Sequence, residues 1–172
     1  MATVPNLTRT LLPLPMILFM GCAVLEPNRP PAPTPTGWVH YSQGLLSFDR
    51  PSEWTMATRP TSDNSLDIFF TSMSTGQERC VLAIHFGIEF YFPTMPSIKP
   101  FAKQAFNTRI SGARTKRINA PESELPGTSE GLIELGGTGP FRRAHFRYAH
   151  LEGTTRQAAE QVIASIRNKA SK

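Results

Sequence analysis

The sequence lacks two motifs that mark common enzyme and redox classes. It has no Cys-x-x-Cys pair and no glycine-rich phosphate loop followed by Lys-Ser/Thr. The stretch Gly136-Gly137-Thr138-Gly139 suggests such a loop only superficially, and because a strand is predicted next, we interpret it as a hairpin turn. We therefore expect no catalytic residues and no cofactor, and we predict that the protein is not an enzyme.

Histidine and cysteine, the residues that most often bind transition metals, are few. His145 and His150 are an odd number of residues apart on one predicted strand and so point to opposite faces. His85 and Glu89 share a face, but at ~3.3 Å per residue they lie ~13 Å apart. Ligands of one ion each lie only ~2 Å from it. A metal site would need pairing between strands that the sequence does not reveal, so we expect none.

The sequence has only two cysteines, Cys22 and Cys80. If Cys22 carries lipid, Cys80 has no partner within the chain, which excludes an internal disulfide. Because Cys80 falls in an apolar strand pattern, we expect a buried thiol that packs as a small hydrophobic group. A reactive thiol is the alternative.

Long apolar runs are also absent. The longest near the start is Leu11–Met20, and two prolines interrupt it. Roughly ten residues are too few for a transmembrane helix, which needs ~20. Arg9 precedes the run and Gly21-Cys22 ends it, which is the layout of a secretory signal peptide. A cysteine directly after the small residue resembles a bacterial lipobox.

These features divide the chain into three parts. Residues 1–21 are predicted to be a lipoprotein signal peptide, residues 22–37 a lipidated cysteine with a Pro-rich, semi-rigid tether, and residues 38–172 one domain. Acyl chains such as palmitate on Cys22 would anchor the domain in the cell envelope, facing the periplasm. Ala23 rather than Asp after the cysteine favours the outer membrane. Phe19 stands where lipoboxes usually have Leu, which leaves an ordinary cleaved signal as the alternative.

The formal net charge is +5. Basic residues are scattered along the chain, so the sequence does not indicate nucleic acid as a partner. A surplus of this size permits attraction to anionic lipid or to an acidic protein.

Hydrophobic periodicity predicts an α+β fold with a largely antiparallel twisted sheet flanked by helices. The predicted strands are Trp38–Tyr41, Leu45–Phe48, Leu66–Thr71, Arg79–Phe92, Lys116–Asn119, Gly131–Leu135 and Phe141–Leu151. One helix is predicted over Lys99–Ser111, with Gly112 as its C-cap. A second begins with a capping box at Thr154 and Gln157, and buries one face made of Ala159, Val162, Ile163 and Ile166.

The pattern Tyr41, Phe48, Pro51 and Trp54, with the closing Val162–Ile166 segment, resembles the PsbP-like superfamily. Bacterial members include lipid-anchored periplasmic proteins of the DcrB type. The resemblance covers roughly residues 38–167 and implies a twisted antiparallel sheet with helices on both faces. It implies no enzyme and no shared ligand, because members act as accessory, assembly or binding proteins.

Two segments are candidate partner-binding surfaces. Arg143, His145 and Arg147 share one strand face and form a cationic stripe suited to carboxylate or phosphate groups, unless that face is merely solvated. The second is the aromatic end of the long predicted strand, where Tyr91, Phe92 and Met95 are the candidates for exposure.

We therefore predict a non-catalytic, membrane-anchored lipoprotein that binds a protein partner, with an immunity protein against a secreted toxin as a special case. The alternative is an envelope protein that binds a small ligand or lipid in an apolar pocket between sheet and helix.

Replacing Cys22 with Ala removes the predicted acylation site. We expect the wild-type protein in the membrane fraction of its own cells and Cys22→Ala in the soluble fraction, because two or more acyl chains anchor a protein stably and none remains in the variant. Cell fractionation with immunoblotting measures the difference. A variant that partitions as the wild type does would rule out the anchor.

Overall fold

The computed structural model describes residues 35–61, 64–74, 77–87, 91–137, 139 and 141–169. The predicted signal peptide, Cys22 and most of the tether lie outside these residues. None of the helices in the described part of the chain has the length and apolar character needed to span a membrane.

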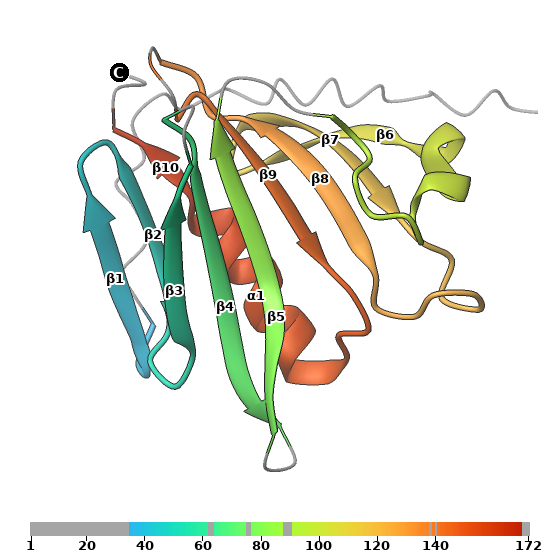
Figure 1. Ribbon diagram of the computed structural model, residues 1–172, viewed down its shortest axis with the longest axis horizontal. Helices are drawn as coiled ribbons and strands as arrows, with labels where there is room; N and C mark the ends of the chain where they lie inside the picture. The colour runs from blue at the N-terminus through green and yellow to red at the C-terminus, as the bar shows by residue number, and fades with distance from the viewer. Residues whose placement is uncertain are drawn as a thin grey trace, which may run out of the picture. The chain divides into compact units, whose positions relative to one another are not determined.

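The described strands form two antiparallel sheets, accompanied by one α-helix, α1 (Gly153–Ser165). The larger, seven-stranded sheet has the order β3 (Thr55–Pro60), β4 (Leu66–Ser74), β5 (Gln77–Gly87), β9 (Arg143–Tyr148), β8 (Ser129–Glu134), β7 (Ala113–Asn119), β6 (Phe106–Ile110). The smaller one pairs β1 (Trp38–Gln43), β2 (Leu46–Pro51) and β10 (Arg167–Asn168). Figure 1 shows the larger sheet twisting across α1, which lies behind it in this view. The α+β class and the antiparallel sheet are as predicted.

The main core lies between α1 and the larger sheet. The four apolar positions predicted on the last helix are all buried: Ala159, Val162, Ile163 and Ile166. They belong to one cluster with large side chains of the sheet, such as Phe70, Leu82 and Phe146. The spacing of i, i+3, i+4 and i+7 places the helical residues on one face, and burying each large aliphatic or aromatic side chain contributes about 1.5–3 kcal/mol.

A smaller cluster lies on the opposite face of the sheet, over β7. Its buried members are Ile98, Phe101, Ile118 and Ala120. Ile98 and Phe101 come from the chain around a short 3-10 helix, η1 (Lys99–Gln104). This segment and the residues before it cover the β7–β8 side of that face, and none of the described residues covers the surface over β4 and β5.

The helix predicted over Lys99–Ser111 is wrong. Only η1 is helical, and β6 and β7 follow as a hairpin in which Ile110 pairs with Ala113. Ser111 and Gly112 both have positive φ, 49° and 86°. Two such residues form the tight turn whose twist suits a hairpin, so Gly112 is a turn residue and not a C-cap.

Two finer predictions are also wrong. Cys80 is exposed rather than buried, because a bulge at Val81 breaks the alternation: Phe70 pairs with Leu82, but Thr71 pairs with Cys80. The predicted capping box does not form either. The N-cap of α1 is Glu152, which makes no side-chain cap hydrogen bond. Gly153, with φ of +52°, turns the chain into the helix one residue before Thr154.

Candidate functional site

The structure brings the two predicted partner-binding segments together on the sheet face opposite α1. Thr94 and Met95 lie against β8 and β9, and the ring of Phe92 meets the ring of His145 edge-on with centroids 6.2 Å apart. The segment Tyr91–Met95, which we call the β9 loop, therefore covers part of the strand face that carries Arg143, His145 and Arg147.

Glu130 on β8 is the residue that joins these segments, and the sequence analysis missed it. Its side chain has no exposed surface. Its Oε1 accepts hydrogen bonds from the Thr94 backbone N–H at 2.5 Å and from Thr94 Oγ1 at 3.0 Å, and its Oε2 accepts one from the Met95 N–H at 3.0 Å. His145 Nε2 lies 2.7 Å from Oε1. Four contacts thus hold one buried carboxylate. We call Glu130 and its contacts with Thr94, Met95 and His145 the Glu130 clasp.

The ionisation of Glu130 follows from these contacts. Burial alone would raise the pKa of the carboxyl group, but the hydrogen bonds from His145 and from the Thr94 and Met95 backbone outweigh it, so the pKa lies below its ordinary value. Glu130 is therefore charged at neutral pH, and the β9 loop is held by charge-assisted hydrogen bonds.

The three residues of the predicted cationic stripe have different environments in the structure. His145 is buried in the clasp, with 5% of its surface exposed, and Arg143 Nε donates to Glu134 at 3.0 Å. Arg147 is exposed, and among the described residues it has no carboxylate within ion-pair distance. Its hydrogen-bond partner is Thr94 Oγ1, at 3.4 Å. Of the stripe, only Arg147 presents a largely uncompensated charge.

The predicted aromatic surface is divided too. Tyr91 is 92% exposed. Phe92 and Met95 are half-buried and pack against the smaller core cluster. The β9 loop thus presents Tyr91 outward and uses its other two candidates to stay in place.

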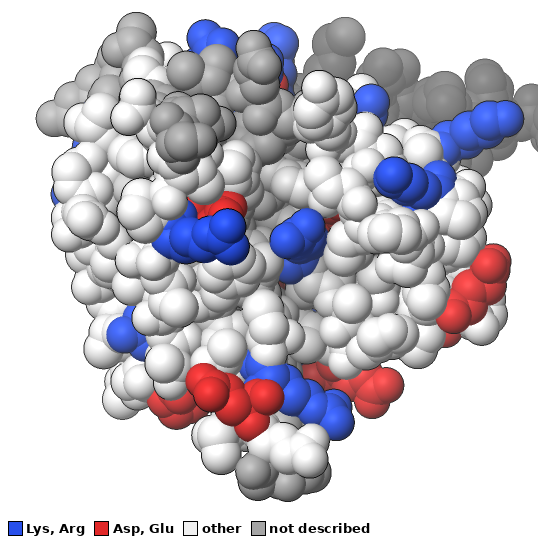
Figure 2. All heavy atoms as spheres, viewed as in Figure 1, with Lys and Arg blue, Asp and Glu red and all other residues white. Residues whose placement is uncertain are grey.

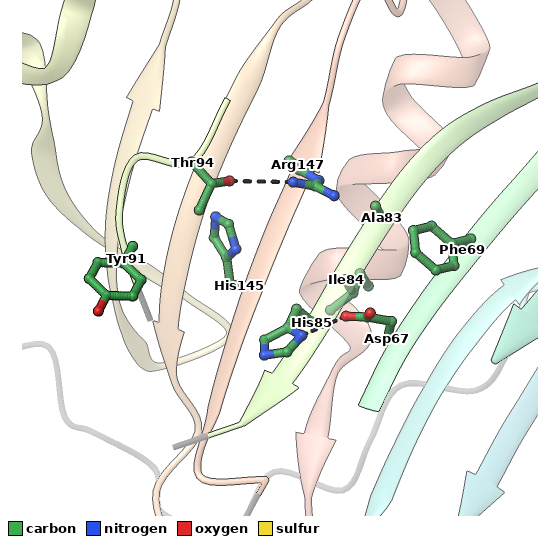
Figure 3. A pocket seen from close by; sticks show the side chains of 9 residues that line it. All are labelled: Asp67, Phe69, Ala83, Ile84, His85, Tyr91, Thr94, His145 and Arg147. Atoms are coloured by element: carbon green, nitrogen blue, oxygen red, sulfur yellow. Dashed lines mark hydrogen bonds and ion pairs between the residues drawn. The ribbon is translucent and has the colours of Figure 1, made fainter. Parts of the chain in front are cut away.

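A hollow of about 250 Å³ lies beside the β9 loop (Figure 3). Ala83 on β5 sits in its floor between Phe69 of β4 and Arg147 of β9, which are its partners on the neighbouring strands. The small methyl side chain between two long ones creates the hollow. Asp67 and His85 form another side, with His85 Nδ1 2.5 Å from Asp67 Oδ1, and His145, Thr94 and Tyr91 complete the lining.

The open face around this hollow has more basic than acidic groups. Cross-strand register adds Arg59, Arg114 and Lys116 to the face that carries Arg147. Figure 2 shows lysine and arginine side chains across the middle of this face. Two of the acidic groups on the same face, Glu130 and Asp67, are already hydrogen-bonded to histidines.

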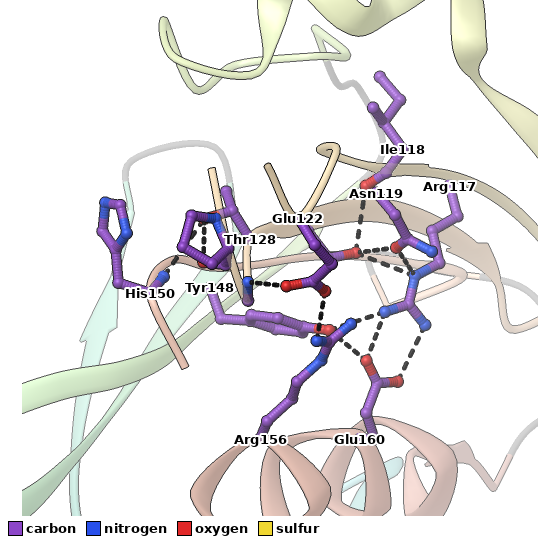
Figure 4. A network of polar contacts seen from close by, with 12 residues as sticks. Arg117, Ile118, Asn119, Glu122, Thr128, Tyr148, His150, Arg156 and Glu160 are labelled. Carbon is purple, nitrogen blue, oxygen red and sulfur yellow. Dashed lines mark hydrogen bonds and ion pairs between the residues drawn. The ribbon is translucent and has the colours of Figure 1, made fainter. Parts of the chain in front are cut away.

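A second polar cluster lies on the other face and connects α1 to the sheet (Figure 4). Arg117 Nη1 donates to Glu160 Oε2 at 2.9 Å, its Nη2 donates to the Tyr148 hydroxyl at 2.8 Å, and Tyr148 donates to Glu160. Burial opposes ionisation of Glu160, but the bonds from Arg117 and Tyr148 prevail and lower its pKa. Burial and Glu160 raise the pKa of Tyr148. The cluster is fully occupied by its own bonds and serves to fix α1.

The sequence also holds a Gly-x-Ser-x-Gly pattern, at Gly127–Gly131. In a hydrolase this pattern places the serine on a sharp turn from a strand into a helix. Here Ser129 begins β8, is 1% exposed, and donates to the Ile118 carbonyl at 3.1 Å while accepting from Arg117 Nε. The pattern therefore forms part of the sheet and not a nucleophile elbow.

Among the residues that the structure describes, no three His, Cys, Asp or Glu side chains are placed to hold a metal ion. No protein-family model, curated protein or solved structure matches the chain at a significant level. Functional inference for this chain therefore depends on the geometry of its own surface.

Glu130→Gln removes the charge of the clasp and weakens its hold on the β9 loop. We expect a loss of about 3 kcal/mol in the free energy of unfolding, at the lower end of what breaking a buried ion pair costs. We also expect faster hydrogen exchange at the Thr94 and Met95 amides. Glu134→Gln, which breaks the exposed pair with Arg143 on the same strand face, should cost under about 1 kcal/mol.

A comparison of the wild type with Glu130→Gln also tests how the stability depends on pH. Because the pKa of Glu130 is lowered in the folded state, its stabilisation is complete above the ordinary glutamate value of about 4.3 and is lost as the pH falls through the lower value. The stability difference between wild type and Glu130→Gln should shrink as the solution becomes more acidic than about pH 5. Unchanged amide protection in the variant would show that Glu130 does not hold the loop.

Arg117→Met tests the second cluster. Breaking a buried ion pair costs about 3–5 kcal/mol, but Glu160 keeps 35% of its side chain exposed, so we expect a loss of about 2–3 kcal/mol in chemical denaturation. Arg156→Met is the matched control, because Arg156 pairs on the surface with Glu122. Equal losses in the two variants would contradict a special role for Arg117.

Proposed function

We propose that the protein is a non-catalytic binding lipoprotein of the cell envelope, anchored through Cys22, whose open sheet face binds an acidic protein partner. The observation that carries this proposal is the combination of Tyr91, 92% exposed on a loop clamped by Glu130, with the exposed guanidinium of Arg147 beside it. Exposed aromatic and arginine side chains supply a large share of the binding energy at protein interfaces.

The hollow beside Tyr91 and Arg147 suits one side chain of a protein partner better than a drug-sized small molecule. The hollow measures about 250 Å³, below the roughly 300–1,000 Å³ of pockets that enclose drug-sized ligands. The centre of the space between α1 and the sheet is filled by side chains that are almost fully buried, such as Phe70, Phe146 and Val162. At one end of this space, Ile163 and Ile166 line a hollow of about 520 Å³ together with Arg114. An envelope protein that binds a small ligand there is the alternative function.

A rigid loop favours recognition, because a surface that is already ordered loses less entropy on binding. The charge-assisted bonds of the Glu130 clasp supply that order. An immunity protein that blocks a secreted toxin is the special case of this function that suits such a loop. A PsbP-like relationship is in keeping with an antiparallel sheet that has α1 on one face and η1 on the other. The proposed site of the protein is the outer membrane, facing the periplasm.

Site-specific photocrosslinking tests the proposal. A photoreactive phenylalanine analogue at Tyr91 should capture one dominant partner in the protein's own cells. The same analogue at Leu45, which is 40% exposed in the turn between β1 and β2 of the smaller sheet, serves as the control and should not capture it. Tyr91→Ala should reduce co-purification of that partner by about tenfold or more, as expected for a central aromatic contact.

Equal crosslinking from both positions, or none from Tyr91, would refute a partner surface at the β9 loop. A toxin as the captured partner would establish the immunity role.

A further inference from the structure

We propose that the hollow floored by Ala83 is a subsite for a single oxyanion group, recognised by Arg147. This inference deepens the proposed function, because the most direct source of such a group is an acidic side chain or a C-terminal carboxylate of the protein partner. A phosphate group shares the same chemistry and is the second source.

Register places the recognising groups around one point. Phe69, Ala83 and Arg147 are successive partners across β4, β5 and β9, and His85 and His145 are partners in the next row of the same face. Figure 3 shows these side chains around the hollow, with Arg147 on one side and His85 with Asp67 on another. A group lying over Ala83 thus meets Arg147 directly.

The positive charge of Arg147 explains why the group bound in the hollow is an anion. A guanidinium has five N–H donors and matches a carboxylate through two parallel hydrogen bonds. Arg147 uses one donor, on Thr94 Oγ1 at 3.4 Å, which is longer than the usual 2.7–3.2 Å. The two carboxylates nearest the hollow are engaged elsewhere: Asp67 by His85 and Glu130 by the clasp. Most of the hydrogen-bonding capacity of Arg147 is therefore free for a ligand.

The other walls of the hollow restrict the kind of group to which the anion is attached. Phe69 and Ala83 form an apolar side suited to one or two methylene groups, and Tyr91 stands at the rim. The volume of about 250 Å³ is enough for one side chain. A carboxylate on a short aliphatic stem satisfies both the charge and the apolar wall.

Ligand-observed saturation-transfer NMR on the full chain tests the subsite. The probes are glutarate, its neutral analogue glutaramide and, by ³¹P line broadening, inorganic phosphate, all at constant ionic strength. We expect glutarate to bind the wild type in the millimolar range and glutaramide to bind at least tenfold more weakly. Phosphate binding tighter than glutarate would support the subsite and assign it to a phosphorylated ligand.

Variants locate the binding. Arg147→Gln removes the cation and Ala83→Leu fills the hollow without changing charge, and each should weaken glutarate binding about tenfold or more. Arg143→Gln is the control, because Arg143 lies on the same strand face but pairs with Glu134, and it should bind as the wild type does. Equal binding of glutarate and glutaramide, or wild-type binding by both Arg147→Gln and Ala83→Leu, would overturn the proposal.

The subsite and the proposed function can fail separately. A partner crosslinked at Tyr91 together with no binding of either anion would leave the partner surface standing and remove the subsite. Anion binding that depends on Arg147, with no crosslinked partner, would keep the subsite and replace the protein partner with a small acidic ligand.

Discussion

The surface of this protein depends on one buried carboxylate. A buried charged group is strongly destabilising unless it is paired and hydrogen-bonded, and Glu130 meets that condition through Thr94, Met95 and His145. The same bonds that make the charge tolerable also set the path of the β9 loop. The position of Tyr91 and one wall of the hollow at Arg147 follow from this path.

The two faces of the larger sheet are completed by different means. One face is covered by α1 through an apolar stripe, and the Arg117–Tyr148–Glu160 bonds fix the helix at its edge. The other face is covered over β7 and β8 by the β9 loop and η1. Within the described part of the chain, side chains of β4 and β5 on this face have neighbours in the sheet but none above it. Asymmetric covering of this kind leaves a surface available for a partner.

Alternation and helical spacing were enough to predict β4, most of β5, β8, β9 and the buried face of α1. They failed where one pattern fits two structures. Phe101, Ala105, Phe106 and Ile110 fit a helical stripe as well as a short turn followed by a strand, and only the positive φ of Ser111 and Gly112 separates the two. The β-bulge in β5 could not be predicted from the alternation either. The extra residue of a bulge reverses the faces of all positions before it, as at Cys80.

Individual residues of the candidate site could be predicted from the sequence, but the contacts that bring them together could not. Arg147 and Tyr91 could be selected as a cation on a strand face and an aromatic next to prolines. Glu130 could not, since its importance arises from its contact with His145 on the next strand and from contacts with a loop 35 and 36 residues away in the sequence. Long-range register determines which side chains pair, and here it places Arg143 beside Glu134 and His145 beside Glu130 while leaving Arg147 exposed. A stripe of three basic residues in the sequence is thereby reduced to one exposed guanidinium, and a fixed group on an ordered surface loses less entropy on binding than a mobile one does.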